Sequence, residues 1–403
     1  MNMITKMYMD RNIRLFGVYK IFTKRVFLPL TSIYASQAAG LSVAQIGLIA
    51  SFSSGVSLFF ESSTGFWADI HGRKKSAQIG SLLAALGTVF YVFGQNFYGI
   101  LCASIIIAIG YSFLSGAMEA LIHDSLIVLG KEKDYAKIAS RAQSLSLIAN
   151  AIFITTIPLL YPIDKRLPFV AGFIAYLVLF TLSSLLTEPP IKHRSDAKKD
   201  SFFATVRKLI NRKTLLFFVS AGFIYSVISG ITDIFNLGFV ELGMPPKLLG
   251  IVFGVASIVG AIVGLFVHNL KRLSFRQYAT LDVMVSSTMF ISFGILKSLP
   301  LAIGAFVINM SLWRFQKIMY QHYILELYGQ KRYKATLLSL ISNFGLLHEI
   351  WLAIVFSKLA QNIGILPSLS YGLVMMALFL PIFLLSIKLF VTDAKASLAS
   401  SNH

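Results

Sequence analysis

Charged residues are scarce in this sequence, and acidic residues are the scarcest of them. Asp, Glu, Lys and Arg together make up 13% of the 403 residues, whereas about 25% is usual in soluble globular domains. Hydrophobic residues make up 56%, and the mean hydropathy is +0.74. This composition excludes an ordinary soluble globule.

Signatures of enzymes and of nucleotide-driven machines are also missing. The sequence contains no G-x-x-x-x-G-K-[ST] phosphate loop, so ATP is not expected to drive this protein directly. It shows no His/Cys cluster with the spacing of metal ligands and no nucleophile–base grouping. The single cysteine, Cys102, lies in an apolar run and is expected to pack as a small side chain. No enzyme activity, metal or cofactor is therefore predicted.

Apolar runs of roughly 20 residues, long enough to cross a hydrocarbon core of ~30 Å, recur from end to end. Residues 1–12 are polar and are not followed by a small-residue cleavage site, so no cleavable signal peptide is expected. The pattern predicts an all-α polytopic membrane protein. Twelve spans are expected at about 13–36, 44–66, 76–95, 97–128, 136–160, 168–187, 214–240, 246–269, 277–298, 300–326, 334–361 and 367–391.

The formal net charge of +19 is distributed unevenly along the chain. Basic residues collect in alternate loops, as in 73–75, 131–137 and 192–213, and the intervening loops hold few of them. This is the positive-inside pattern, and it predicts that both termini lie in the cytoplasm. A nucleic-acid partner is a poor interpretation of the charge.

A short motif lies between the second and third spans. Residues 65–75 read G-F-W-A-D-I-H-G-R-K-K, a predicted polar loop in which Asp69 and Arg73 are four residues apart. Together with Glu61 upstream, the segment resembles the E-x-P-T-G-x-x-A-D-x-x-G-R-[RK] signature of prokaryotic members of the major facilitator superfamily. Two positions depart from that signature: Ser63 replaces the proline and Ile70 replaces a basic residue.

The resemblance implies the fold of this superfamily, with two six-helix bundles and transport by alternating access. It also implies a charge relay that closes one side of the transporter, in which the motif pairs with an acid at the end of the fourth helix. The acid in that place here is Asp124. The implied gate residues are Gly65, Asp69, Gly72, Arg73, Lys74 and Asp124. Static pairs that only fix the fold are the alternative.

An internal repeat supports two bundles. Gly40 and Gly47 open the second span, and Gly243 and Gly250 open the eighth, 203 residues later. Chance likeness between glycine-rich segments is the alternative. Parallel repeats of this kind are common in transporters. The predicted domains are a bundle at 1–187, a basic linker with an amphipathic helix at 188–213, a bundle at 214–391 and a cytoplasmic tail at 392–403.

Charges inside the spans carry the predicted mechanism. Lys20, Lys24 and Arg25 lie in the first span, where each would cost about 2.5–3.5 kcal/mol facing lipid at mid-depth. As a continuous helix this span would place Lys20 and Lys24 on one face and Arg25 about 100° further round. Because Lys20 lies near the end of the helix, its ammonium group could instead extend to the membrane–water interface. Lys24 and Arg25 are therefore expected to face an aqueous cavity or an acid.

The cavity is predicted to bind substrate through polar side chains of both halves. The resemblance places helices 1, 4, 7 and 10 around a central cavity, to which Lys24, Arg25 and Arg314 would bring net positive charge. The alternative is that Glu349, Asp233 or Glu61 neutralises these residues, so that the cavity is merely polar. The substrate-cavity candidates are Lys20, Lys24, Arg25, Tyr225, Asn236, Arg314, Lys317 and Asn343.

Carboxylates in the spans are candidates for proton coupling, because an acid beside a basic group can bind and release protons during a cycle. The candidates are Glu61, Glu119, Glu349 and Asp233. Permanent structural salt bridges are the alternative for Glu61 and Glu119.

The predicted function is secondary active transport of a small anionic or zwitterionic organic solute, coupled to protons, across a prokaryotic cell membrane. Multidrug efflux by a drug/proton antiporter is an alternative, although residues 144–160 lack the G-x(8)-G-[AP]-G pattern of such antiporters. A non-transporting membrane receptor or scaffold is an alternative of another class. The expected partners are the solute, protons and the lipid bilayer, and nothing in the sequence requires a second chain.

Overall fold

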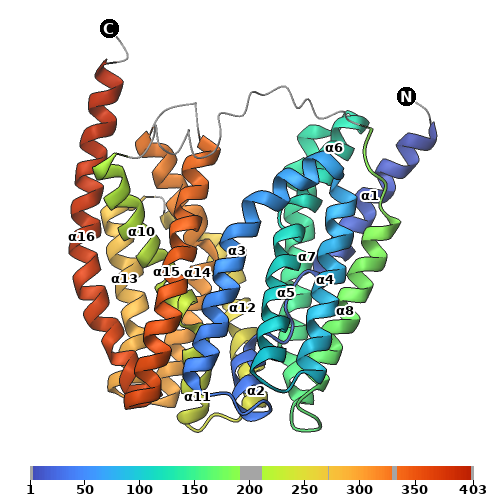
Figure 1. The fold of residues 1–403 in the computed structure, drawn as a ribbon. Coiled ribbons are helices and arrows are strands. Elements are labelled where there is room, and N and C mark those ends of the chain that lie inside the picture. The colour runs from blue at the N-terminus through green and yellow to red at the C-terminus, as the bar shows by residue number, and fades with distance from the viewer. Residues whose placement is uncertain (1–2, 191–210, 271, 329–333, 401–403) are drawn as a thin grey trace. The chain divides into compact units, whose positions relative to one another are not determined.

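The computed structural model describes residues 3–190, 211–270, 272–328 and 334–400, and every regular element in these ranges is a helix (Figure 1). The chain divides into two compact units. Unit 1 comprises Met1–Ser195 and Pro245–Ser257, and unit 2 comprises Asp196–Met244 and Ile258–His403. The predicted amphipathic helix of the linker lies outside the described residues, and the predicted domain boundaries stay a prediction.

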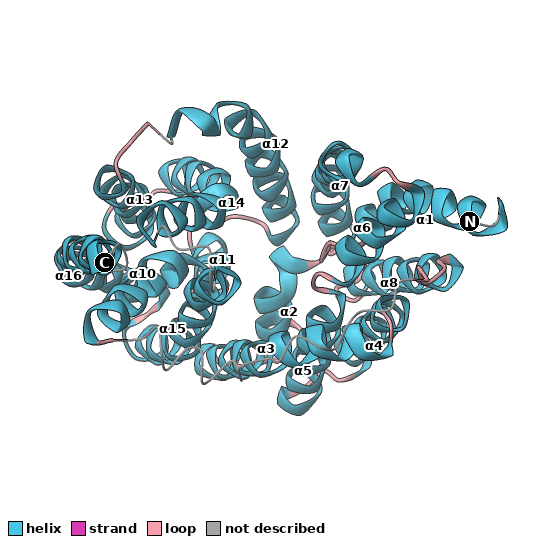
Figure 2. Cartoon of the chain, turned by 90° about the horizontal axis from the view of Figure 1, so that it is seen from above, coloured by secondary structure: helices cyan, strands magenta, loops and turns pink. Residues whose placement is uncertain are grey.

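Unit 1 is a bundle of long helices joined by short connections. Its helices are α1 (Met3–Phe22), η1 (Leu28–Leu30), α2 (Thr31–Gln37), α3 (Val43–His71), α4 (Arg73–Phe93), α5 (Phe97–Leu114), α6 (Ala117–Leu129), η2 (Glu132–Asp134), α7 (Tyr135–Thr156), η3 (Ile157–Leu160), α8 (Leu167–Leu185) and the first part of α12 (Pro246–Leu270). Within it, α4 packs between α5 and α8, and α1 packs against α6 and α7 (Figure 2).

Unit 2 is built around α10. Its helices are α10 (Arg212–Gly230), α11 (Thr232–Glu241), the later part of α12 (Pro246–Leu270), α13 (Phe275–Phe290), the π-helical turn η4 (Ile291–Ile295), α14 (Leu299–Tyr328), α15 (Lys334–Ile363) and α16 (Ile365–Ser400). Buried phenylalanines hold α10 in place: Phe223 stacks on Phe379 of α16 with 3.7 Å between ring centroids. Phe218 stacks on Phe344 of α15.

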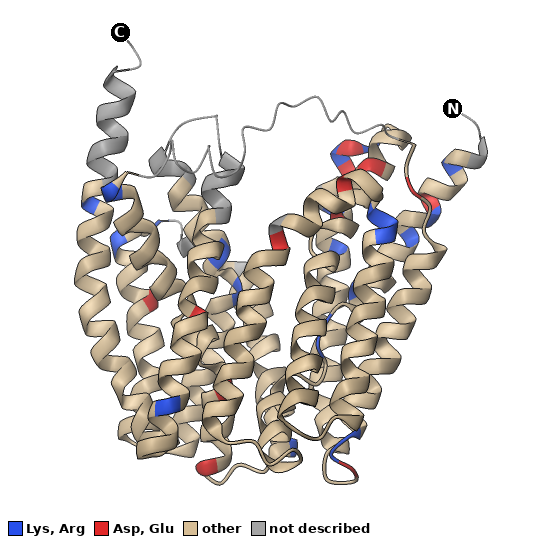
Figure 3. Cartoon of the chain, in the orientation of Figure 1, with Lys and Arg blue, Asp and Glu red and all other residues tan. Residues whose placement is uncertain are grey.

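Ten helical segments in the described part of the chain are long and apolar enough to cross a bilayer. Helices α1 and α14 fall outside that set, because charged and amide side chains interrupt their apolar runs. In unit 1, charged residues gather at the end where α1 begins, with a smaller group at the opposite end (Figure 3). The predicted all-helical, polytopic fold class is confirmed.

The first predicted span is not one continuous helix. Helix α1 ends at Phe22, and no helix covers residues 23–27 before η1 and α2 begin. Lys24 and Arg25 therefore lie in a break, and the expectation that Lys20 and Lys24 share one helical face is wrong. The fourth span is also interrupted, between α5 and α6, where Gly116 has a φ of 72°.

The repeat seen in the sequence has a structural counterpart. Gly40 precedes α3 with a φ of 65°, and Gly243 precedes α12 with a φ of 90°. Residues other than glycine rarely adopt backbone angles in this left-handed region. The same backbone requirement thus recurs ahead of the second and the eighth predicted spans, which favours a true repeat over chance likeness.

Small residues allow α4 and α5 to approach closely. A Cβ atom added at Gly80 would lie 2.7 Å from the carbonyl oxygen of Gly110, and one added at Gly110 would lie 2.8 Å from the carbonyl oxygen of Gly80. Helix pairs inside membranes are held by such close packing, since lipid provides no hydrophobic drive for association.

Gly80→Ala is therefore expected to destabilise unit 1 by about 1–3 kcal/mol, because the new methyl group meets a backbone oxygen that cannot move aside alone. Thermal unfolding of the detergent-purified protein measures the effect. Gly304→Ala is the matched control, since nothing lies within 4 Å of a Cβ at that position of α14. Equal melting temperatures for the two variants would contradict this packing.

Candidate functional site

The motif at residues 65–75 is helical rather than a loop, apart from Gly72. Helix α3 continues through Gly65 and Asp69 to His71, and α4 begins at Arg73. The turn is made by Gly72 alone, with a φ of 103°. The predicted polar loop is thus wrong in extent, because the backbone hydrogen bonds of α3 continue past the end of its apolar run. Gly65 lies inside the helix with open space around it.

Arg73 joins the predicted relay. Its Nη1 pairs with Oδ2 of Asp124 from α6, and its Nη2 lies 3.7 Å from Oδ1 of Asp69. The side chains of Arg73 and Asp124 are only 12% and 9% exposed, whereas that of Asp69 is 52% exposed. Charge-assisted pairs strengthen as water is excluded. The Arg73–Asp124 pair is accordingly the stronger contact of the two.

Glu188 belongs to the same cluster and was missed in the sequence. Its two carboxylate oxygens accept hydrogen bonds of 2.8 Å from the backbone N–H groups of Arg73 and Lys74. The first N–H groups of a helix have no partner within the helix, and the helix dipole favours a negative charge there. The motif that opens α4 is therefore held to the segment after α8. The only sequence signal was an acid placed directly before Pro189-Pro190.

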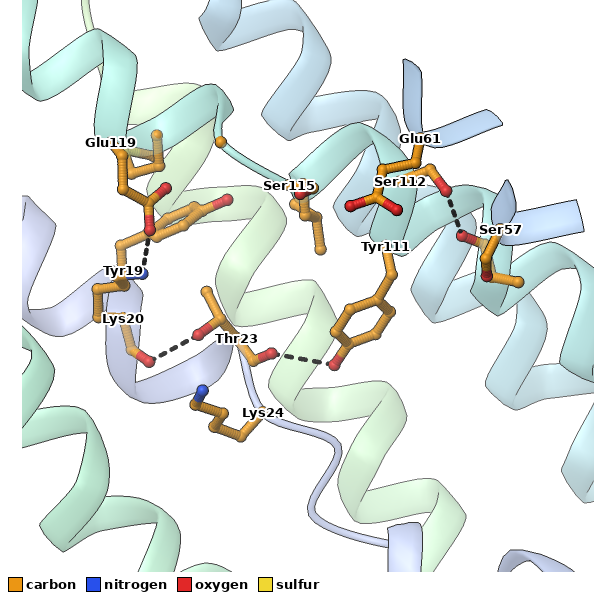
Figure 4. A pocket seen from close by; sticks show the side chains of 14 residues that line it. Tyr19, Lys20, Thr23, Lys24, Ser57, Glu61, Tyr111, Ser112, Ser115 and Glu119 are labelled. Carbon is orange, nitrogen blue, oxygen red and sulfur yellow. Dashed lines mark hydrogen bonds and ion pairs between the residues drawn. The ribbon is translucent and has the colours of Figure 1, made fainter. Parts of the chain in front are cut away.

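A polar cavity of about 380 Å³ lies in unit 1 (Figure 4). Its wall comes from α1 and the break after it, from α3 and α5, and from α6. Two lysines and two glutamates line it: Lys20, Lys24, Glu61 and Glu119. Lys20 and Glu119 form an ion pair, with side chains 18% and 37% exposed. The structure thus brings together four of the candidates named from the sequence.

The break after α1 is stabilised by side chains that satisfy its backbone. The carbonyl oxygen of Lys20 accepts hydrogen bonds from Thr23 and from Ser146 of α7. The hydroxyl of Tyr111 donates to the carbonyl oxygen of Thr23 at 3.0 Å. Irregular backbone at membrane depth requires such internal partners.

Arg25 does not line the cavity but lies behind it. Its guanidinium carbon is 4.1 Å from the centre of the Tyr111 ring, a cation–π geometry. Tyr111 itself lines the cavity. Arg25 is therefore placed against a residue of the cavity wall, and its place in a substrate cavity shared by both halves stays a prediction.

The unit 2 candidates are more dispersed. The Glu349 carboxylate on α15 accepts a hydrogen bond of 2.6 Å from Ser229 of α10. Asp233 lies in the first turn of α11, where a helix dipole favours a carboxylate. Asn236 is buried, and its Oδ1 has no hydrogen-bond partner among the described residues.

The remaining unit 2 candidates fall on α10, α14 and α15. The side chain of Arg314 packs against α12: a Cβ atom added at Gly260 would lie 2.8 Å from the Cδ atom of Arg314. Lys317 is exposed, Asn343 is half-buried, and Tyr225 packs edge-on to Tyr320. A cavity shared by the candidates of both units stays a prediction.

One intramembrane acid was overlooked in the sequence. Asp282 of α13 accepts hydrogen bonds from Gln316 and Tyr320 of α14. It is the only acidic residue of α13, and an isolated acid in a predicted span was the available sequence signal.

The family model of the Major Facilitator Superfamily matches residues 17–347. The chain belongs to this superfamily. It is therefore a multi-pass membrane protein and a secondary transporter, not an enzyme. A curated relative, the uncharacterized MFS-type transporter YxaM of Bacillus subtilis (strain 168), is 25% identical over 374 residues, which are 89% of this chain and 91% of YxaM.

Solved structures share the superfamily fold. The nucleoside transporter NupG matches with a TM-score of 0.76 at 13% identity, covering 95% of this chain and 99% of NupG. The POT family transporter PepTSo matches with a TM-score of 0.67 at 13% identity, covering 96% and 98% of the two chains. At these identities the likeness concerns the fold alone.

The geometry of the superfamily motif predicts unequal coupling within the relay. In double-mutant cycles with alanine, the Arg73–Asp124 coupling energy is expected to exceed about 1 kcal/mol, because both groups are buried. The Arg73–Asp69 coupling is expected to stay within about 0–1 kcal/mol, as for exposed ion pairs. Denaturant unfolding in detergent measures both, and a reversed order would contradict the arrangement.

Proposed function

We propose that this transporter moves a small zwitterionic or anionic organic solute by alternating access, that it couples the movement to protons, and that the unit 1 cavity holds part of the solute. The observation that carries the proposal is the lining of that cavity by ammonium and carboxylate groups together. Ligand sites place a few oriented polar groups in an otherwise enclosed wall, and a solute with both signs of charge matches this lining.

The Lys20–Glu119 pair supports the proton coupling. While Glu119 is ionised, it neutralises Lys20. Protonation of the carboxylate would remove that partner, so the ammonium would be left to bind an anionic group of the solute. A proton and an anionic group would thus enter the site together. Glu61, Asp233 and Glu349 remain further candidates for the same role.

The cluster around Arg73 supports a gate. Bundles that rock against each other make and break contacts at their ends, and the buried Arg73–Asp124 pair with Glu188 lies at one end of α3, α4 and α6. The distribution of basic loops supports a cytoplasmic position for both termini and a cell-membrane location.

Ligand-induced stabilisation of the purified protein tests the substrate class, because a bound solute raises the melting temperature by mass action. A panel of amino acids, organic acids and quaternary ammonium compounds is screened first. Zwitterions or anions are expected to stabilise the protein. Uptake of the best solute into proteoliposomes is then expected to accelerate under an imposed proton gradient.

Lys24→Gln is expected to weaken binding of that solute about tenfold or more, since a charged hydrogen bond contributes about 1.5–3 kcal/mol. Lys133→Gln, at an exposed position of η2, is the matched control. Stabilisation by cationic amphiphiles alone would favour drug efflux instead. A folded protein that moves no solute of the panel under any gradient would contradict the proposal.

A further inference from the structure

Asp282 occupies an unusual environment for an acid. It lies in the middle of α13, within a membrane-length apolar segment. Its Oδ2 accepts hydrogen bonds from Nε2 of Gln316 at 2.8 Å and from the hydroxyl of Tyr320 at 3.0 Å. Both donors are neutral, so neither balances the charge of an ionised carboxylate. An acid inside a membrane span is costly and is usually paired or functional.

Among the described residues, no Lys, Arg or His forms an ion pair with Asp282. The titratable groups that face it from α13, α14 and α10 are the tyrosines Tyr278, Tyr320 and Tyr225. The π-helical turn η4 carries no titratable residue, and Tyr371 and Lys388 of α16 are exposed. Arg314, two residues before Gln316, lies against α12 instead.

Asp282 borders a small polar cavity of about 10 Å³. This volume matches one water molecule or one monatomic ion. Four further oxygen-bearing side chains line it. Ser286, Asn309 and Gln316 are almost fully buried, at 2%, 5% and 4% exposed, and Tyr225 is half-buried. Asn309 donates to the hydroxyl of Ser286 at 3.3 Å, which leaves its own amide oxygen available.

Gln316 provides the second, independent sign of a ligand. Its amide nitrogen is used by Asp282, but its buried Oε1 has no hydrogen-bond partner among the described residues. Leaving a buried acceptor without a donor costs about 1–3 kcal/mol. A cation beside Asp282 would satisfy both the carboxylate and this amide oxygen.

We propose that Asp282, Ser286, Asn309 and Gln316 form a binding site for one monovalent metal cation, Na⁺, that neutralises Asp282. Hard cations take oxygen ligands from carboxylates, amides and hydroxyls. One carboxylate balances one positive charge, so the site suits a monovalent cation better than Mg²⁺ or Ca²⁺, which usually take several carboxylates or waters.

The proposal rests on the proposed function in one respect: a cation bound here would be a coupling ion of the transporter. Binding itself requires no transport and no solute, so it is measured separately. The structural alternative is that the hydrogen bonds of Asp282 only tie α13 to α14. Such a tie would not make stability respond saturably to a specific cation.

Melting temperatures of the purified full chain test the site. NaCl is titrated against choline chloride at constant ionic strength and constant pH. We expect a saturable stabilisation by Na⁺ and loss of that response in Asp282→Asn.

Further variants keep the test decisive if Asp282→Asn does not fold. Asn309→Ala and Gln316→Leu are expected to weaken Na⁺ binding about tenfold. Glu241→Gln, at an exposed acid, and Gln321→Leu, on α14 outside the cavity, are the controls. The proposal is overturned if Na⁺ has no saturable effect, or if the four variants respond alike.

Discussion

A charge inside the hydrocarbon layer must find its partner within the protein, since lipid offers none. The same holds for backbone groups where a helix is interrupted. Much of the local structure around the candidate sites follows from this constraint. Unit 1 combines a broken first helix with hydroxyls that bind its freed carbonyl groups, and it combines intramembrane lysines with glutamates.

The two units meet the constraint in different ways. In unit 1, Arg73 and Lys20 are each neutralised by a carboxylate. The side chains of the Arg73–Asp124 pair are more deeply buried than those of the Lys20–Glu119 pair. In unit 2, Asp282 is held by a neutral amide and a neutral hydroxyl. Pairs of the first kind are suited to exchange partners with a charged solute or with one another. An acid of the second kind is suited to receive a small cation.

Much of the fold could be predicted from the sequence, because each apolar run of membrane length can only be a buried helix or a span. The ion pairs of the motif could also be predicted, because it carries Asp69 and Arg73 at helical spacing, and the structure places Asp124 beside them. The positions of the local interruptions could not. Pro29 disfavours a continuous helix through the residues before it, but it does not determine where α1 ends, since Tyr111 and Ser146, which stabilise the break, are distant in the chain.

Contacts of long sequence separation explain the other omissions. Glu188 caps α4 from more than a hundred residues away, and its role depends on where α8 ends. Asp282 acquires its role only through Gln316 and Tyr320, which reach it from the next helix. The contact of Arg25 with the Tyr111 ring could not be predicted either, because the two residues are distant in the chain.

The most direct measurement is cysteine labelling of the unit 1 cavity in membranes. Cys102→Ser removes the single native cysteine, and a new cysteine is then placed at Ser57 in the cavity wall or at Leu82 on the exposed face of α4. A hydrophilic, anionic thiol reagent is expected to modify the first and to spare the second, and a transported solute is expected to slow the reaction at Ser57. Modification of the cysteine at position 82 alone, or of neither cysteine, would show that the charged cavity is not open to water, and the account would be wrong.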